Sequence, residues 1–184
     1  MSNPGSLRHR LQIQTKTVAT GNVFTTEDAT AADSWATDLT VWGAVHPLRG
    51  TERFNGQQVT PDLSHSVEMR YTPRVNAENR ILYPKYFATL ATALNTTETA
   101  VAITETIGIS ASSKIRMQID SELMEVTAGQ GTTGLTTTRA VDGTTAASHS
   151  TGALVTLMGE LNVAAVIDPD ERNTNLSLLC AEYP

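Results

Sequence analysis

Short runs in which apolar and polar residues alternate recur along the whole chain, and this period of two constrains its fold more than any other feature. Leu11 and Ile13 alternate with amide side chains in LRHRLQIQ, and Val67 and Met69 alternate with polar residues in SHSVEMR. Such alternation is typical of β-strands with one buried and one solvated face. The sequence therefore predicts a mainly β protein.

Composition agrees with this and excludes several classes of protein. Threonine, a strand-favouring residue, occurs 29 times among 184 residues, and 17 of these lie in residues 84–159. Charged residues make up only 17% of the chain, which is low for a disordered protein. The pI of about 5.1 argues against a dedicated nucleic-acid binder. No run of eighteen apolar residues occurs, so we expect no membrane span.

The expected strands are bounded by turn residues. They are residues 7–18, 34–47 (ending at Pro47), 64–71, 79–83, a hairpin over 115–127 with its turn at Asp120-Ser121, two strands on either side of Asp142-Gly143, and a final hairpin, LNVAAVID and NLSLLCAEY, around PDERNT. Tyr86, Leu90 and Leu94 have helical spacing, so a short helix is expected over 85–94. Residues 20–33 and 49–63 are expected to form loops, the second with a short helical turn over 51–58.

The final hairpin suggests how the chain is divided. A two-stranded hairpin alone is marginally stable in water, so we expect it to complete a sheet begun by the N-terminal strands. The expected fold is a small antiparallel β-barrel formed by residues 1–83 plus 160–184. It is interrupted by an inserted β-rich domain, residues 84–159, with one short helix. The insert has its own apolar periodicity and is expected to fold independently, with its ends close together.

No pattern of residues indicates catalysis. The four histidines lack the spacing of a zinc site, and Cys180 has no second cysteine to pair with. The glycines of AGQGTTGL lack the lysine of a phosphate-binding loop, and Asp142 and His149 lie near serines without forming a recognisable triad motif. We therefore expect no enzyme, catalytic residue, metal or cofactor.

Arginine supplies seven of the eight basic residues between positions 7 and 83, where the acids are equal in number. Its planar guanidinium suits contacts with carboxylates at interfaces, although solvated strand-face charges are an equally good interpretation. Residues 160–184 carry five acids against Arg172. The candidate residues for a ring or partner interface are Arg8, Arg10, Arg49, Glu52, Arg53, Arg70, Arg74, Asp168, Asp170 and Glu171.

Several segments taken together resemble the phage head–tail joining (head closure, or head completion) family. They are LRHRLQIQ, VWGAVHPLRGTERF, SHSVEMRYTP, NRILY and VAAVIDPDERNTNLSLLCAEY, in this order and spacing. The chain departs from the family pattern in having residues 84–158 between NRILY and the next strand. Those residues resemble, more loosely, a small β module of phage virion structural proteins, in which the Asp142-Gly143 turn and His149 are structural.

The resemblance implies a structural virion protein of the neck, assembled in the host cytoplasm. It would form a sixfold or twelvefold ring below the portal or adaptor, close the DNA-filled head and offer a docking surface to a tail terminator or tail tube protein. Genomic DNA would pass without sequence-specific binding, and the ring either plugs the DNA or only bridges head and tail. The loop expected to reach the lumen or a neighbouring ring contains Arg49, Gly50, Thr51, Phe54, Asn55, Gln57, Gln58 and Asp62.

Two other functions are considered. The threonine-rich insert suggests a receptor- or carbohydrate-binding virion module. A cell-wall hydrolase is the least favoured, because no acid/base pair is evident.

Overall fold

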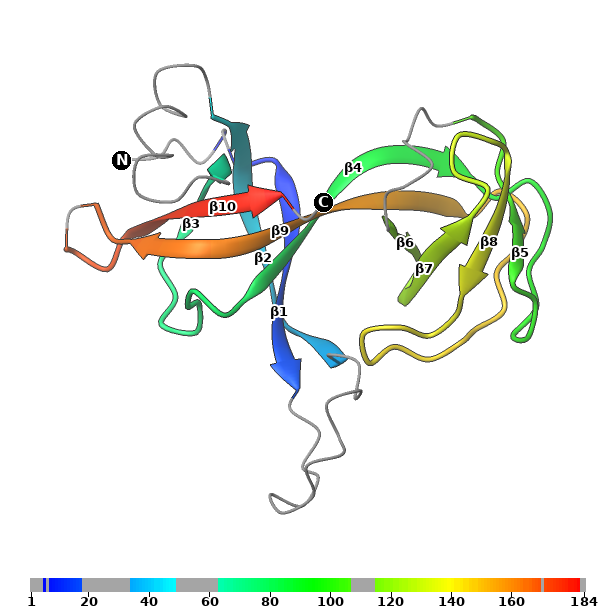
Figure 1. Cartoon of the computed structure of the whole chain (residues 1–184), viewed down its shortest axis with the longest axis horizontal. Coiled ribbons are helices and arrows are strands. Elements are labelled where there is room, and N and C mark those ends of the chain that lie inside the picture. Colours follow the sequence, from blue (N-terminus) through cyan, green and yellow to red (C-terminus); the bar gives the residue numbers. More distant parts are fainter. Residues whose placement is uncertain are drawn as a thin grey trace, which may run out of the picture.

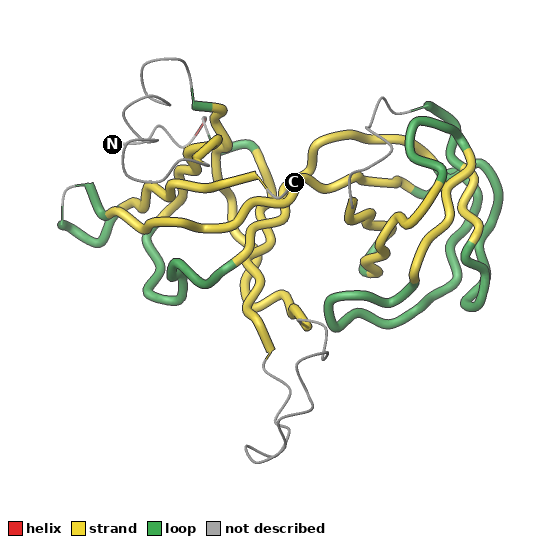
Figure 2. Tube along the Cα trace, viewed as in Figure 1, coloured by secondary structure: helices red, strands yellow, loops and turns green. Residues whose placement is uncertain are grey.

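Strands dominate the computed structural model, which describes residues 5, 7–17, 34–48, 63–106, 115–169 and 171–182. No α-helix occurs among these residues, and the mainly β class is confirmed (Figure 2). No helix in this part of the chain is long and apolar enough to span a membrane. The strands are β1 (His9–Thr17), β2 (Ser34–Pro47), β3 (Leu63–Arg70), β4 (Arg80–Thr89), β5 (Ala100–Ala102), β6 (Ile115–Ile119), β7 (Glu122–Ala128), β8 (Gly134–Thr138), β9 (Leu154–Ile167) and β10 (Asn175–Glu182).

Six of these strands form a closed ring, which we call the first ring. Its antiparallel order is β10-β3-β2-β1-β4-β9, and β9 pairs again with β10. The β9–β10 hairpin predicted from the sequence closes it, with Ser177 opposite Ile167. Strand β2 pairs with β1 up to Gly43 and with β3 from Gly43 onward. A Cβ at Gly43 would lie 2.3 Å from Leu11 Cδ1, so this corner of the ring requires glycine.

A second ring is formed on the other half of β4 and β9. Its order is β4-β9-β6-β7-β8-β5. This ring is closed just beyond β4, next to β5. There Leu90 forms a β-bridge with Ile103, and the Ala91 amide donates a hydrogen bond of 2.8 Å to the Ala102 carbonyl oxygen. Figure 1 shows the two rings as separate lobes, joined by β4 and β9, which pass from one to the other.

Each ring encloses its own apolar cluster. The first contains Leu11, Val67, Met69, Ile81, Leu161 and Cys180, and its buried members all lie in residues 11–83 and 161–180. The second contains Leu90, Leu94, Met117, Met124 and Val155, and its buried members all lie in residues 88–157. The alternating apolar residues of β4 and β9, the strands that both rings share, thus contribute to two separate cores.

The helix predicted over residues 85–94 is wrong. Residues 85–89 continue β4 past an irregularity between Pro84 and Tyr86, and residues 86–89 pair with β9 from Leu157 to Leu154. The helical spacing of Leu90 and Leu94 arises because both side chains enter the second core, at 1% and 4% exposure. Pairing with β9 overrides the local preference for a helix.

Gly159 lies opposite Tyr83 on the paired β4 and β9, and the tyrosine ring fills the space of its missing side chain. A Cβ there would lie 2.4 Å from two atoms of this ring, which is itself buried in the first core. We expect Gly159→Ala to lower the free energy of unfolding by about 1–3 kcal/mol, because the ring has little room to move. Chemical denaturation should measure this loss. Gly134→Ala, whose Cβ would enter open space, is the matched control, and an equal loss in both variants would contradict the explanation.

Candidate functional site

The predicted interface arginines that the structure describes lie at the surface of the first ring. Arg8, Arg10 and Arg70 are all exposed. The guanidinium of Arg10 lies 5.4 Å from the centroid of the Trp42 ring, which is itself 53% exposed. Arg74 forms an exposed ion pair with Asp38. Arg8, Arg10 and Arg70 are therefore accessible to a partner protein, whereas the guanidinium of Arg74 is already paired with the carboxylate of Asp38.

Two of the predicted acidic residues, Asp168 and Glu171, lie in the β9–β10 turn, and Arg70 lies beside this turn, opposite Asn175 at the start of β10. Asp168 accepts a hydrogen bond of 2.9 Å from the Asn173 amide through Oδ2. Glu171 is exposed and, like Asn173, has a positive φ. The side-chain bond and these two left-handed residues define the shape of the turn.

The remaining predicted interface residues lie outside the described residues. They are Arg49, Glu52, Arg53 and Asp170, together with the whole candidate lumen loop: Arg49, Gly50, Thr51, Phe54, Asn55, Gln57, Gln58 and Asp62.

The joint between the two rings contains a buried ionic network around Arg80. Its guanidinium, 4% exposed, lies 2.9 Å from Asp142 Oδ2 and 3.0 Å from Glu160 Oε1. It also donates two hydrogen bonds, of 2.6 and 2.8 Å, to Oε1 of Gln14, the residue opposite it on β1. The ring of Trp35 covers Arg80 at 4.5 Å. This guanidinium therefore links β1, β2, β4 and β9 to the loop that follows β8.

Asp142 also binds a second arginine, Arg116, which belongs to the second ring. Arg116 Nε, on β6, donates a hydrogen bond of 2.9 Å to Asp142 Oδ2, while its Nη1 lies 2.6 Å from Glu125. Asp142 has a positive φ and begins the predicted Asp142-Gly143 turn. The Cβ that Gly143 lacks would lie 3.6 Å from Ala36 of β2, so the turn packs directly against the first ring.

An apolar cluster adjoins this network. Leu82, Leu123 and Met158, at most 5% exposed, pack together with the half-buried Val141. They come from β4, β7, β9 and the Asp142 loop. The rings are therefore held together by buried apolar contacts and ion pairs as well as by the two shared strands.

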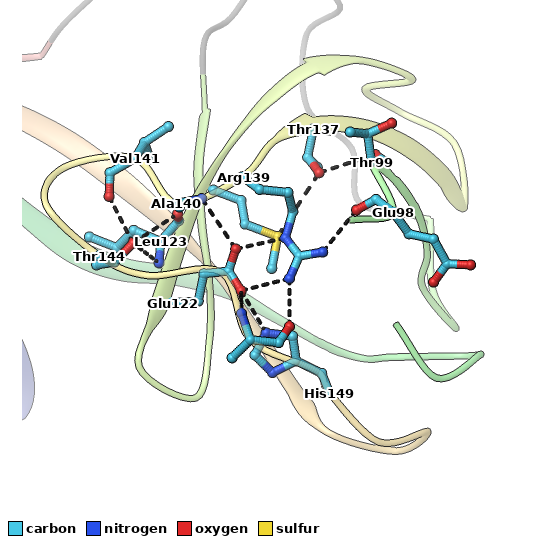
Figure 3. A network of polar contacts seen from close by, with 12 residues as sticks. Glu98, Thr99, Glu122, Leu123, Thr137, Arg139, Ala140, Val141, Thr144 and His149 are labelled. Atoms are coloured by element: carbon cyan, nitrogen blue, oxygen red, sulfur yellow. Dashed lines mark hydrogen bonds and ion pairs between the residues drawn. The ribbon is translucent and has the colours of Figure 1, made fainter. Parts of the chain in front are cut away.

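A second ionic network lies inside the second ring, centred on the fully buried Glu122 (Figure 3). Arg139 forms two hydrogen bonds with its carboxylate, of 2.6 and 2.7 Å. The amides of Ala140 and Ala147 donate to it at 3.2 and 2.9 Å. His149 Nε2 lies 3.0 Å from Glu122, and His149 Nδ1 lies 2.8 Å from Asp120.

The other nitrogens of Arg139 hold the surrounding loops in place. Nη1 donates to the carbonyl oxygens of Asn95 and Glu98, and Nη2 donates to that of Ala147. This network therefore ties the β4–β5 and β8–β9 loops to the start of β7. The expectation that His149 is structural agrees with these contacts.

Burial alone raises the pKa of Glu122, but the hydrogen bonds from Arg139, the Ala147 amide and His149 outweigh it and lower the pKa to about 2. The carboxyl is ordinarily near 4.5, so the stability it contributes is complete above that pH and is lost as the pH falls towards 2. We expect the free energy of unfolding to decrease by about 3 kcal/mol from this group over that interval. Urea denaturation at several pH values should show the decrease in the wild type, and Glu122→Gln should lack this part of it. Parallel pH profiles for the two proteins would contradict the assignment.

These networks are suited to stabilisation rather than to reaction. The carboxylate of Glu122 is already occupied by several donors, and His149 has a carboxylate at each ring nitrogen. The described part of the chain has no group of three histidine, cysteine or acidic residues suited to a metal ion.

Sequence reasoning missed both networks, although one signal was available. Glu122 is in phase with Met124 and Val126, both buried, on β7. A carboxylate at an inward position requires a buried cation, which pointed to an arginine elsewhere in the insert.

Comparison with known families adds the decisive observation. The sequence model of the phage head completion protein family matches residues 2–88. Over these residues the chain is similar to the phage head completion family. The match contains β1 to β3 and nearly all of β4, and ends one residue before β4 does. The family is one of structural phage head proteins rather than enzymes, and the predicted relationship is confirmed. A search of curated proteins found no significant match.

Proposed function

We propose that this chain is a head completion protein, which forms a ring at the head–tail interface of a tailed phage, in the neck of the virion. There it closes the DNA-filled head below the portal or adaptor and presents the docking surface for a tail terminator or tail tube protein. The observation that carries this proposal is the family match over residues 2–88, which supply four of the six strands of the first ring. Six or twelve copies would suit the symmetry of a portal.

The charge of the chain is suited to a passage for DNA. Each phosphate that a protein neutralises adds affinity, so a strongly basic lumen would hold the genome in place. A chain with a net charge of -6 makes a ring that binds DNA weakly and lets it slide.

We also propose that residues 84–159 are an insertion in the head completion fold of residues 1–83 plus 160–184. The separation of buried apolar residues into clusters drawn from 88–157 and from 11–83 plus 161–180 supports it. So does the end of the family match at residue 88. Pro84 lies opposite Met158, so an Asn-Gly turn in place of residues 85–157 would make β4 and β9 a plain hairpin.

The shortened chain tests the division. With Leu82→Thr and Met158→Thr added to remove the apolar surface that the insert covers, it should unfold cooperatively and keep a β-type circular dichroism spectrum. The control is the full-length chain with the same two threonine substitutions. If this control folds but the shortened chain is insoluble or unfolded, the division is contradicted.

The function itself is tested by removing the gene from the phage and supplying it in trans. Without the protein, we expect filled or leaking heads and free tails, and supplying it during infection should restore tailed particles. Normal tailed particles that fail only to adsorb would contradict the proposal and favour the receptor-binding alternative. The threonine hydroxyls that suggested glycan binding include several that bond to the protein backbone instead, such as those of Thr132, Thr137 and Thr144.

A further inference from the structure

A groove with a volume of about 470 Å³ lies between the two rings. Arg10 and Thr40 line it from the first ring, Phe87 from β4, and Gln118 and Leu154 from the side of the second ring. Phe87 and Leu154 are 58% and 57% exposed, an unusual exposure for such large apolar side chains placed close together. Because Phe87 pairs with Thr156 and Thr89 with Leu154, the two side chains lie diagonally on one face of the β4–β9 pair.

The charge in the groove is unevenly distributed. Arg10 has no ion pair among the described residues and only the Trp42 ring beside it. On the opposite side the one carboxylate is that of Asp120, which lies 2.8 Å from His149 Nδ1. The groove therefore offers an apolar floor with an unpaired cation at one edge.

The β9–β10 turn has the complementary character. Ile167, at the end of β9, is 42% exposed, and the turn that follows carries Asp168, Asp170 and Glu171 against Arg172. This is an apolar side chain followed by a net negative charge, which Arg70 on the neighbouring β3, opposite Asn175, reduces without cancelling. The Asp168–Asn173 hydrogen bond and the left-handed residues Glu171 and Asn173 give the turn a defined shape. A contact surface already in shape loses less entropy when it binds.

The turn cannot reach the groove of its own chain. Figure 1 shows the β9–β10 turn at one end of the long axis, remote from the joint between the rings. A contact between them must join two copies head to tail, and such heterologous contacts generate a closed ring when the rotation between copies closes.

We propose that the groove receives the β9–β10 turn of a second copy of this chain, with Ile167 against Phe87 and Leu154 and with Glu171, an exposed acid of the turn, facing Arg10. The proposal rests on the ring of the proposed function and names the surfaces by which its subunits meet. A stable contact buries about 800 Å² on each partner, so the turn is one anchor within a larger interface.

Paired cysteines test the contact in assembled particles. Thr40→Cys places a thiol at the groove and Arg172→Cys places one at the turn. The native Cys180 is fully buried, and burial raises the pKa of its thiol to about 12, so it does not compete. Particles made with the double variant should give, after mild oxidation and denaturation without reductant, a ladder of linked copies. Particles with either single variant should give only the monomer.

Charge reversal supplies a second readout. Arg10→Glu and Glu171→Arg should each lower the yield of tailed particles about tenfold or more, because like charges then meet, whereas the double variant should restore it. Glu78→Arg, in an exposed turn outside both surfaces, should leave the yield unchanged.

The outcomes separate this inference from the proposed function. Suppose that the neck contains a ring of this protein, but that the double-cysteine variant stays monomeric or crosslinks to a different virion protein. This result overturns the proposed docking surface and leaves the proposed function standing. Absence of the protein from the neck overturns both.

Discussion

Replacing Arg80 by methionine is expected to lower the free energy of unfolding by about 3–5 kcal/mol. The substitution leaves Glu160, 11% exposed, without its cation and leaves Asp142, 5% exposed, with Arg116 alone. It also frees the Gln14 oxygen that accepts two hydrogen bonds from Arg80. A buried charge without a partner is among the most costly changes a single substitution makes. Urea denaturation followed by tryptophan fluorescence measures the loss, because Trp35 lies on Arg80.

Arg74→Met is the matched control. Its ion pair with Asp38 is exposed, at 53% for the arginine side chain, and such pairs contribute at most about 1 kcal/mol. A triple variant with Arg80→Met, Asp142→Asn and Glu160→Gln should recover part of the stability, because the two acids that lose Arg80 are then uncharged while Arg116 keeps Glu125. If Arg80→Met proved as mild as Arg74→Met, the network would not hold the two rings together as described.

Replacing Arg139 by methionine is expected to have an effect of similar size, about 3–5 kcal/mol, in the second ring. Glu122 is fully buried, and Arg139 is the cation that forms two hydrogen bonds with it. The same substitution removes the donors to the carbonyl oxygens of Asn95, Glu98 and Ala147, so the β4–β5 and β8–β9 loops lose an anchor as well. Thermal and urea denaturation should both report the loss.

Two further variants sharpen this prediction. Lys85→Met removes an exposed pair with Glu182 and should cost little. Adding Glu122→Gln to Arg139→Met should restore part of the lost stability, since the glutamine amide carries no charge that would be left unpaired. The recovery should be incomplete, because the Ala147 amide and His149 also bond to the Glu122 carboxylate. A double variant no more stable than Arg139→Met alone would show that the lost carbonyl contacts, rather than the uncompensated charge, dominate.

The strands were largely predictable from the sequence because alternation and turn residues are local signals. Strand β2 ends at Pro47 as predicted, and the β6–β7 hairpin turns at Asp120-Ser121. The prediction failed where a partner distant in sequence decides the structure. Residues 85–89 follow β9 into a strand although Leu90 and Leu94 have helical spacing.

The ionic networks depend even more on distant residues. Arg80 is 4% exposed because Gln14, 66 residues earlier, and Asp142, 62 residues later, meet it at the joint. Local patterns carry no record of such pairings. What the sequence did contain was the family resemblance of the N-terminal segment, which was identified from residue order and spacing and is now confirmed over residues 2–88.

The most direct test of the account is a three-dimensional reconstruction of the neck of the virion. It should contain a ring of this protein between the portal or adaptor and the tail, with the β9–β10 turn of each copy in the groove between the two rings of strands of its neighbour. Density for the protein only in distal fibres, or its absence from the head–tail junction, would contradict the account.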